Sequence, residues 1–221
     1  MSVPTDRVAV LAMVFAALLA GAVPGTAVAG PLEEDFAIAV ANDRVGKVKE
    51  LLARGVDPNS VDAIGEPALV VAARGGNLNT IQVLLAARAN VDARSKTGDT
   101  AIMMAALSGN LAIVKLLRAS GASLENTGWT ALTYAATGGH DAIVSYLLAE
   151  GANINAPSPN GTTALMMAVR EAKGSTVELL IARGADVNRR NQNGATALEW
   201  ALRGNETKMA EQLRRAGAKA N

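Results

Sequence analysis

The residues of this chain that could do chemistry are few, and its one histidine is the first to consider. The 221-residue chain contains one histidine, His140, and no cysteine. A Ser-His-Asp or Cys-His centre needs a histidine that both a nucleophile and an orienting group can reach, and His140 follows two glycines in a turn-like segment. We therefore predict a structural hydrogen-bonding role for His140, no catalytic residue and no cofactor.

Two methionine pairs, Met103-Met104 and Met166-Met167, suggest soft-metal chemistry, because thioethers suit copper. Neighbouring residues on a helix point about 100° apart, so neither pair could chelate one ion well. The expected role of all four side chains is packing in a core, and no metal site is predicted. An enzyme or a metal-handling protein is the less favoured alternative.

The elements around these residues follow from a spacing that repeats along the chain. A slot that usually holds glycine, after an apolar segment, recurs at steps of 33, 33, 30, 33 and 33 residues. The slot is occupied by Gly55, Arg88, Gly121, Gly151, Gly184 and Gly217. Near-equal steps of this length indicate a repeat array in which neighbouring copies stack.

The sequence of each copy predicts two helices, and the fourth copy illustrates the reasons. Thr130 stands before Ala131 where its hydroxyl would cap an inner helix. The small pair Ala135-Ala136 would let that helix sit close to its neighbours. A second apolar helix follows the Gly139 turn, and Gly151 would end it in the left-handed conformation.

The chain thus resembles the ankyrin-repeat family over about residues 33 to 218. The resemblance rests on the Thr-Ala-Leu-x-x-Ala-Ala starts, the Gly-His turn at His140 and the Gly-Ala-x-Val/Ile-Asn closers. It implies an all-α repeat solenoid of about six helix-turn-helix units with short β-hairpin fingers, the end units serving as caps. The expected repeats are residues 33–61, 62–94, 95–125, 126–157, 158–190 and 191–218.

Two departures from the regular pattern carry local predictions. Arg88 replaces a closing glycine, and a left-handed Arg88 would cost on the order of 1 kcal/mol. The single 30-residue step places a three-residue deletion between Glu125 and Gly128, so we expect a shortened finger there. Trp129 stands beside it.

The first 29 residues read as a targeting segment. A short polar start precedes the apolar run Val8–Val23, and Ala27-Val28-Ala29 forms an A-x-A cleavage site. The expected mature domain is therefore residues 30–221, located in the periplasm or, alternatively, secreted. An uncleaved anchor is the other interpretation, although the run is shorter than the roughly 20 residues that a spanning helix needs.

The net charge and the absence of cysteine limit the classes of partner and the kinds of stabilising bond that we expect. Lys and Arg number 21 against 20 Asp and Glu, a net charge of +1. Nucleic acid or an anionic membrane would favour a strong basic excess, so neither is expected as a partner. Without cysteine, no disulfide or thiolate is available, and we expect a monomer held by packing alone.

The family resemblance implies a protein-binding function exerted by finger tips and inner-helix ends. The residues of this chain in those positions are Ile64, Glu66, Arg74, Lys96, Asp99, Leu107, Trp129, Asn160, Arg170, Glu171, Gln192, Asn193 and Arg203. Trp129 would be either a binding hot spot or a packing residue over the shortened finger. The predicted function is an exported scaffold or adaptor for an unidentified periplasmic protein, similar to periplasmic ankyrin proteins that assist an enzyme such as catalase. The alternative is a secreted effector that binds a host protein.

Overall fold

A computed structural model of the chain describes residues 30–125 and 128–219. The expected targeting segment, residues 1–29, and the centre of the expected shortened finger, residues 126–127, lie outside the described residues, and both stay predictions. Within the described part, twelve helices form six pairs of one inner and one outer helix. The all-α repeat solenoid predicted from the sequence is confirmed.

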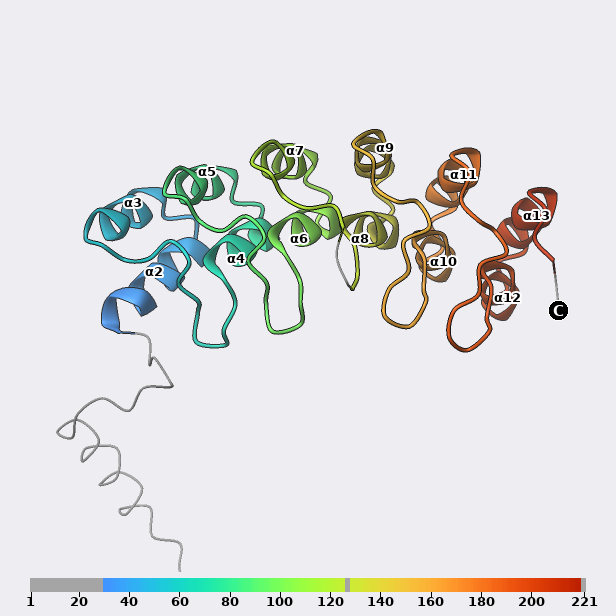
Figure 1. Ribbon diagram of the computed structural model, residues 1–221, viewed down its shortest axis with the longest axis horizontal. Helices are drawn as coiled ribbons and strands as arrows, with labels where there is room; N and C mark the ends of the chain where they lie inside the picture. The colour runs from blue at the N-terminus through green and yellow to red at the C-terminus, as the bar shows by residue number, and fades with distance from the viewer. Residues whose placement is uncertain (1–29, 126–127, 220–221) are drawn as a thin grey trace, which may run out of the picture.

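The helices lie in two stacked rows (Figure 1). The inner row consists of α2 (Pro31–Ala41), α4 (Ala68–Gly75), α6 (Ala101–Leu107), α8 (Ala131–Gly138), α10 (Ala164–Arg170) and α12 (Ala197–Arg203). The outer row consists of α3 (Val45–Ala53), α5 (Leu78–Ala86), α7 (Leu111–Ala119), α9 (Asp141–Ala149), α11 (Gly174–Ala182) and α13 (Thr207–Arg215). We number the pairs as units 1 to 6, so that each unit contacts its neighbours along both rows.

The inner helices begin where threonine side chains cap them. Thr130 Oγ1 accepts from the Thr133 N–H at 3.2 Å. Thr196 and Glu199 form a reciprocal capping box, with bonds of 3.2 and 3.0 Å. The predicted capping role of threonine is confirmed at both helix starts.

The outer helices end in the left-handed conformation that the repeat slot predicted. The five glycines of that slot have φ between 84° and 94°, and Arg88 has φ 65°. Arg88 is therefore left-handed, as predicted. The turn between inner and outer helices is also left-handed, at Gly139 in unit 4 (φ 77°) and at Ala172 in unit 5 (φ 55°).

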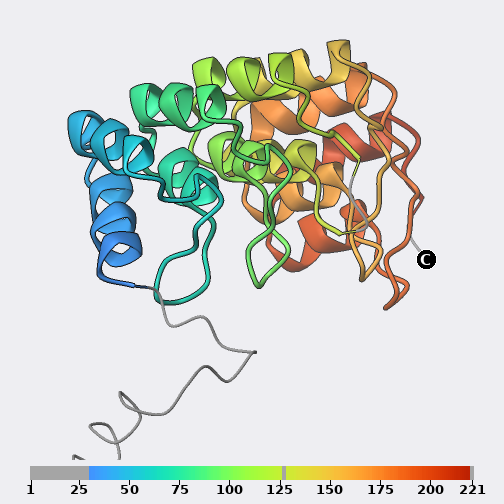
Figure 2. The same ribbon diagram turned by 60° about the vertical axis from the view of Figure 1, so that its left-hand side comes forward.

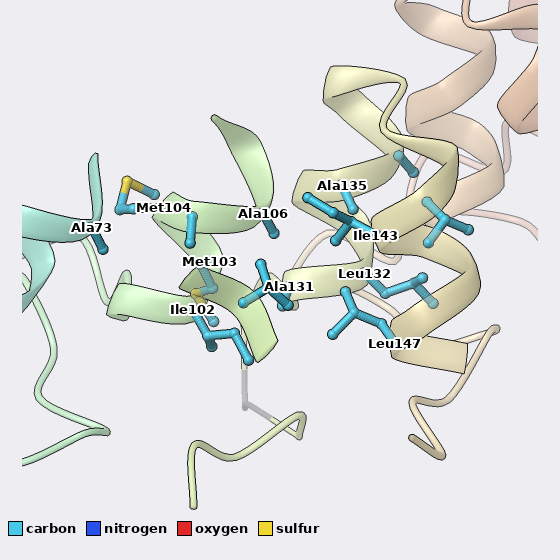
Figure 3. Close-up of a cluster of buried hydrophobic side chains, with 14 of the residues drawn as sticks. Ala73, Ile102, Met103, Met104, Ala106, Ala131, Leu132, Ala135, Ile143 and Leu147 are labelled. Carbon is cyan, nitrogen blue, oxygen red and sulfur yellow. The ribbon is translucent and has the colours of Figure 1, made fainter. Parts of the chain in front are cut away.

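The core follows from close approach of the inner helices. Ala105 and Ala106 are fully buried, and so are Ala135 and Ala136 in the next unit (Figure 3). The four methionines of the two pairs are at most 5% exposed, which confirms their predicted packing role. Each inner helix thus buries both sides against its neighbours, and a single unit could not do so alone.

Recurring hydrogen bonds join one unit to the next. In four places, the side-chain oxygen of a closing Asn or Asp accepts from a backbone N–H about one repeat later. These bonds are Asn59 from Asn90 at 2.7 Å and, each at 2.9 Å, Asp92 from Ser123, Asn155 from Asp186 and Asn188 from Lys219. His140 Nε2 donates to the Leu107 carbonyl oxygen, 2.9 Å away in the preceding unit. The predicted structural role of His140 is confirmed.

Four loops, which we call fingers, lead into inner helices with one shared turn. They are finger 2 (61–67), finger 3 (94–100), finger 5 (157–163) and finger 6 (190–196). In each, two backbone hydrogen bonds of 2.8 to 3.0 Å close the turn around a left-handed glycine. One frame residue per finger also accepts from the backbone four residues later: Asp62, Ser95, Ser158 and Asn191. In the described residues, the β structure of the fingers amounts to a single bridge, between Val61 and Pro67.

The two ends of the array differ from its middle. Glu33 and Glu34 occupy the first turn of α2, where carboxylates favour the helix N-terminus. Met209 and Leu213 of α13 are buried against the array. The helix α2 begins one residue into the described chain, so no described finger precedes it.

Candidate interaction surface

The fingers and the ends of the inner helices lie along one side of the array (Figures 1 and 2). Most side chains predicted to contact a partner are exposed on it: Ile64, Arg74, Lys96, Leu107, Asn160, Arg170, Glu171, Gln192, Asn193 and Arg203. Asp99 and Trp129 are half-buried, and Glu66 is buried. The predicted residues therefore form an extended row across units 2 to 6 and do not converge on one pocket.

In finger 2 the frame and an ion pair hold the tip. Asp62 accepts from the backbone N–H groups of both Ile64 and Glu66. The Glu66 carboxylate pairs with the Arg74 guanidinium at the end of α4. Because Glu66 is only 9% exposed, it positions Arg74, whereas Ile64 and Arg74 present their own side chains to solvent.

Finger 3 is attached to unit 4 by a tyrosine that sequence reasoning missed. The Tyr134 hydroxyl of α8 donates to Asp99 Oδ1 at 2.5 Å, and the Thr97 hydroxyl donates to Asp99 Oδ2 at 2.6 Å. Burial, together with the bond to Asp99, raises the pKa of Tyr134. The Trp129 ring lies 6.3 Å from the Tyr134 ring, tilted by 50°. Half-buried Trp129 thus has a packing partner beside the shortened finger.

Fingers 5 and 6 touch each other directly. The Gln192 N–H donates to the Asn160 carbonyl at 2.9 Å, and its side-chain amide donates to the Pro159 carbonyl at 2.6 Å. Above them, exposed Arg170 pairs with Glu171 at 2.9 Å. Asn160 and Gln192 are therefore held in a fixed mutual position by backbone contacts.

The fingers share one frame but present different tips. The same tip position holds Ile64 in finger 2, Thr97 in finger 3, Asn160 in finger 5 and Asn193 in finger 6. The Thr97 hydroxyl and the Asn160 side-chain oxygen also make hydrogen bonds within their own turns, whereas Ile64 and Asn193 present exposed side chains to solvent. A fixed frame with variable tips suits recognition of an extended surface by many separate contacts.

Two features relevant to other functions concern metals and membranes. The described residues include no group of three or more His, Cys, Asp or Glu side chains placed to hold a metal ion. Each helix in ranges 30–125 and 128–219 is too short or too polar to cross a bilayer.

A groove of about 720 Å³ separates α2 from finger 2. It is lined by Glu33, Glu34, Ala37, Ile38, Ala41, Asn42, Val61, Asp62, Ala63 and Ile64. Three of these apolar side chains are unusually exposed: Ile38 at 46%, Val61 at 44% and Ile64 at 65%. Sequence reasoning identified Ile64 as a surface residue but missed Ile38 and Val61.

Stacked helix pairs, shared fingers and one exposed finger side define a repeat solenoid of the ankyrin class. A family model described as ankyrin repeats (3 copies) matches residues 36–127, 82–158, 121–191 and 151–221. The chain belongs to the ankyrin-repeat family. Proteins of this family generally mediate protein–protein interaction.

Solved structures agree with this assignment. The human ASB11 ankyrin repeat domain is similar over 86% of this chain and 85% of its own, with 29% identity and a TM-score of 0.75. An ankyrin repeat domain from Acinetobacter baumannii AYE is similar over 85% of this chain and 100% of its own, with 31% identity and a TM-score of 0.72. No curated protein sequence matches the chain significantly.

Proposed function

We propose that this protein is an exported interaction scaffold that binds another periplasmic protein through its finger tips and inner-helix ends. One observation carries the proposal: a row of fingers closed by backbone hydrogen bonds presents exposed side chains such as Ile64, Lys96 and Asn193 on one side of the array. The A-x-A sequence at residues 27–29, after an apolar run, supports export.

The chemistry of the row favours a folded protein as the partner. Its cations are interrupted by neutral tips such as Asn160 and Asn193, and Arg74 and Arg170 are paired with Glu66 and Glu171. A polyanion would favour a continuous basic stripe, which this mixture does not provide. Exposed Leu107, at 38%, adds an apolar contact near the centre of the row.

Capture of the partner by cross-linking tests the proposal. The double variant Arg170→Ala/Trp129→Ala should recover at least tenfold less cross-linked partner from a periplasmic extract than the unchanged chain. Gln82→Ala, on the exposed face of outer helix α5, is the matched control and should recover the same amount. Equal recovery by all three chains, each with unchanged thermal stability, would refute binding through this surface.

Export is tested separately by locating the processed chain. We expect the N-terminal residue of the purified protein to be Gly30 and the protein to accumulate in the periplasmic fraction. A chain that retains residues 1–29 would contradict cleavage. Accumulation in the culture medium would instead support the secreted alternative.

A further inference from the structure

We propose that the groove between α2 and finger 2 binds a short segment of the partner protein, one with a large apolar side chain flanked by Lys or Arg. The inference rests on the proposed scaffold function and names the chemistry of one of its contacts. It is carried by the exposed apolar residues of the groove, by its acidic rim and by its size.

The apolar tip is peculiar to finger 2. Where finger 2 has Val61 and Ile64, finger 6 has Arg190 and Asn193 in the same positions, and the other described fingers also lack large aliphatic side chains there. The shared turn therefore forms without apolar tips. Exposed apolar groups that the fold does not require are characteristic of contact surfaces.

The opposite wall of the groove is exposed because of its place in the array. The position of Ile38 recurs in the later units at Val71, Met104, Tyr134, Met167 and Trp200. None of these five is exposed: Met104 and Met167 are buried, at 5% and 3%, and the other three are half-buried. Ile38, in the same position of the first described unit, is 46% exposed. The groove thus lies at the first described helix of the array, and a partner segment would pack between that helix and finger 2.

The charge of the rim determines the chemistry of the segment. Glu33, Glu34 and Asp62 line the groove, and none of its lining residues is basic. Residues 30–66 as a whole contain eight Asp or Glu and four Lys or Arg, a net charge of −4. A segment with basic residues beside its apolar group therefore matches the groove electrostatically.

The dimensions of the groove suit a short segment. The wall from Glu33 to Asn42 spans nine residue steps of α2, or about 14 Å. About four residues of extended chain cover that length. One large side chain with a basic residue on each side therefore fills the groove along the helix.

Two other occupants of the groove would come from this protein itself: a second copy, or the chain's own N-terminal segment. The experiment distinguishes both from a partner segment. A second copy could offer exposed Leu202, at 43%, beside Arg203 of α12. Such a head-to-tail contact does not close and would lengthen with concentration. The chain's own residues 1–29 directly precede the groove wall and could occupy it only while they remain attached.

A cysteine reporter makes the test direct, because the chain has no cysteine. In Ala63→Cys, a thiol-linked environment-sensitive dye would stand on the exposed groove lining of the full chain as purified. The probe is a synthetic peptide, Lys-Gly-Leu-Leu-Gly-Lys, compared with its Glu-flanked and Ser-cored counterparts. We expect the Lys-Leu peptide to bind at least tenfold more tightly than either, with the preference over the Glu peptide shrinking at high salt.

Groove variants provide the second comparison in the same labelled background. Ile38→Ser and Ile64→Ser should each weaken binding of the Lys-Leu peptide at least fivefold, and Ile64→Ser, at a side chain that is 65% exposed, should leave the melting temperature unchanged. Leu202→Ser, 43% exposed on α12 at the other end of the array, is the matched control and should bind normally. Equal binding of the Lys and Glu peptides, or normal binding by both groove variants, would overturn the proposal.

Dye signals without peptide identify the competing occupants. A blue shift that grows with protein concentration would show a second copy in the groove. One that does not depend on concentration, and that is absent from a chain beginning at Gly30, would show the chain's own N-terminal segment. Either result overturns a partner segment as the occupant. If Ile38→Ser leaves partner capture intact while Arg170→Ala/Trp129→Ala abolishes it, this inference fails but the scaffold function stands.

Discussion

Adjacent units contact each other in two different ways at their fingers. The junction between units 5 and 6 differs in this respect from the junction between units 3 and 4. At the first, the backbones of fingers 5 and 6 touch, with the Gln192 N–H bonded to the Asn160 carbonyl. At the second, where the connection is three residues shorter, side chains make the contact: Tyr134 bonds to Asp99, and Trp129 lies against Tyr134.

The space around equivalent glycines differs between the two junctions. A Cβ on Gly161 of finger 5 would lie 3.0 Å from Asn191 Cα, in the backbone of finger 6. A Cβ on Gly98, the equivalent glycine of finger 3, would have no described atom within 4 Å. A full-length neighbouring finger therefore restricts Gly161, whereas at the shorter connection the described contact with finger 3 is made by Tyr134, against which Trp129 lies.

The largest effect on stability is expected from a variant that disrupts the junction between units 5 and 6. Gly161→Ala has a left-handed cost of about 1–2 kcal/mol, and the clash with backbone adds about 1–3 kcal/mol. We expect a loss of about 3 kcal/mol in the free energy of unfolding, measured by urea denaturation.

Gly98→Ala is the matched control for that variant, with φ 86° and open space around the added methyl group. It should lose only about 1 kcal/mol, the backbone cost alone. Equal losses for the two alanines would mean that direct contact between fingers 5 and 6 is not what restricts Gly161.

The next largest effect is expected from a variant at the junction between units 3 and 4. Tyr134→Phe removes the hydroxyl that bonds to Asp99 and leaves the ring against Trp129. A hydrogen bond to a charged group contributes about 1.5–3 kcal/mol, so for a half-buried pair we expect a loss of about 1.5 kcal/mol. Tyr146→Phe, at the chain's other tyrosine, should lose less than about 0.5 kcal/mol in the same denaturation experiment.

Units 4 and 5 differ in the residue that joins their two helices, and a substitution there is expected to increase stability. Both units need a left-handed residue between their helices, Gly139 in one and Ala172 in the other. Ala172→Gly should therefore raise the free energy of unfolding by about 1 kcal/mol. Asn205→Gly, in the same position of unit 6, should change it less, because asparagine tolerates this conformation. A loss of stability in Ala172→Gly would contradict strain at Ala172.

The smallest effect is on the pH profile. The pKa of Tyr134 is raised in the folded chain, so its neutral form contributes stability that is complete below the ordinary tyrosine pKa of about 10. Above that pH the unfolded chain loses the proton first, and this contribution declines. The stability difference between the unchanged chain and Tyr134→Phe should therefore shrink from pH 10 upward. A constant difference up to pH 11.5 would contradict the shift.

Backbone features of the fold could be predicted from the sequence because each unit is stabilised by signals local to it. The slot occupied by Arg88 predicted a left-handed residue whatever its side chain, and the structure has φ 65° there. Thr130 and Thr196 predicted helix starts by the same local logic. His140, beside its turn, predicted a structural bond, although the sequence did not identify the Leu107 carbonyl as its acceptor.

Contacts across units were harder to predict, because they depend on how units are set against each other. Tyr134 and Asp99 are 35 residues apart, and nothing local to either indicates the bond. Glu66 stood among the surface positions, yet it is buried beneath Arg74. Ile38 is exposed in the first described unit, whereas its equivalents in the later units are not, and no pattern within α2 reveals this difference.

The separation of finger frame from finger tip has an evolutionary consequence. Frame residues such as Ser95 and Asn191 hold the turn, while tip residues such as Ile64 and Asn193 present exposed side chains. Mutations at the tips therefore explore new partners without much risk to folding. A gene for such an array could diverge in specificity one finger at a time, and the same property makes its tips suitable positions for a randomised library.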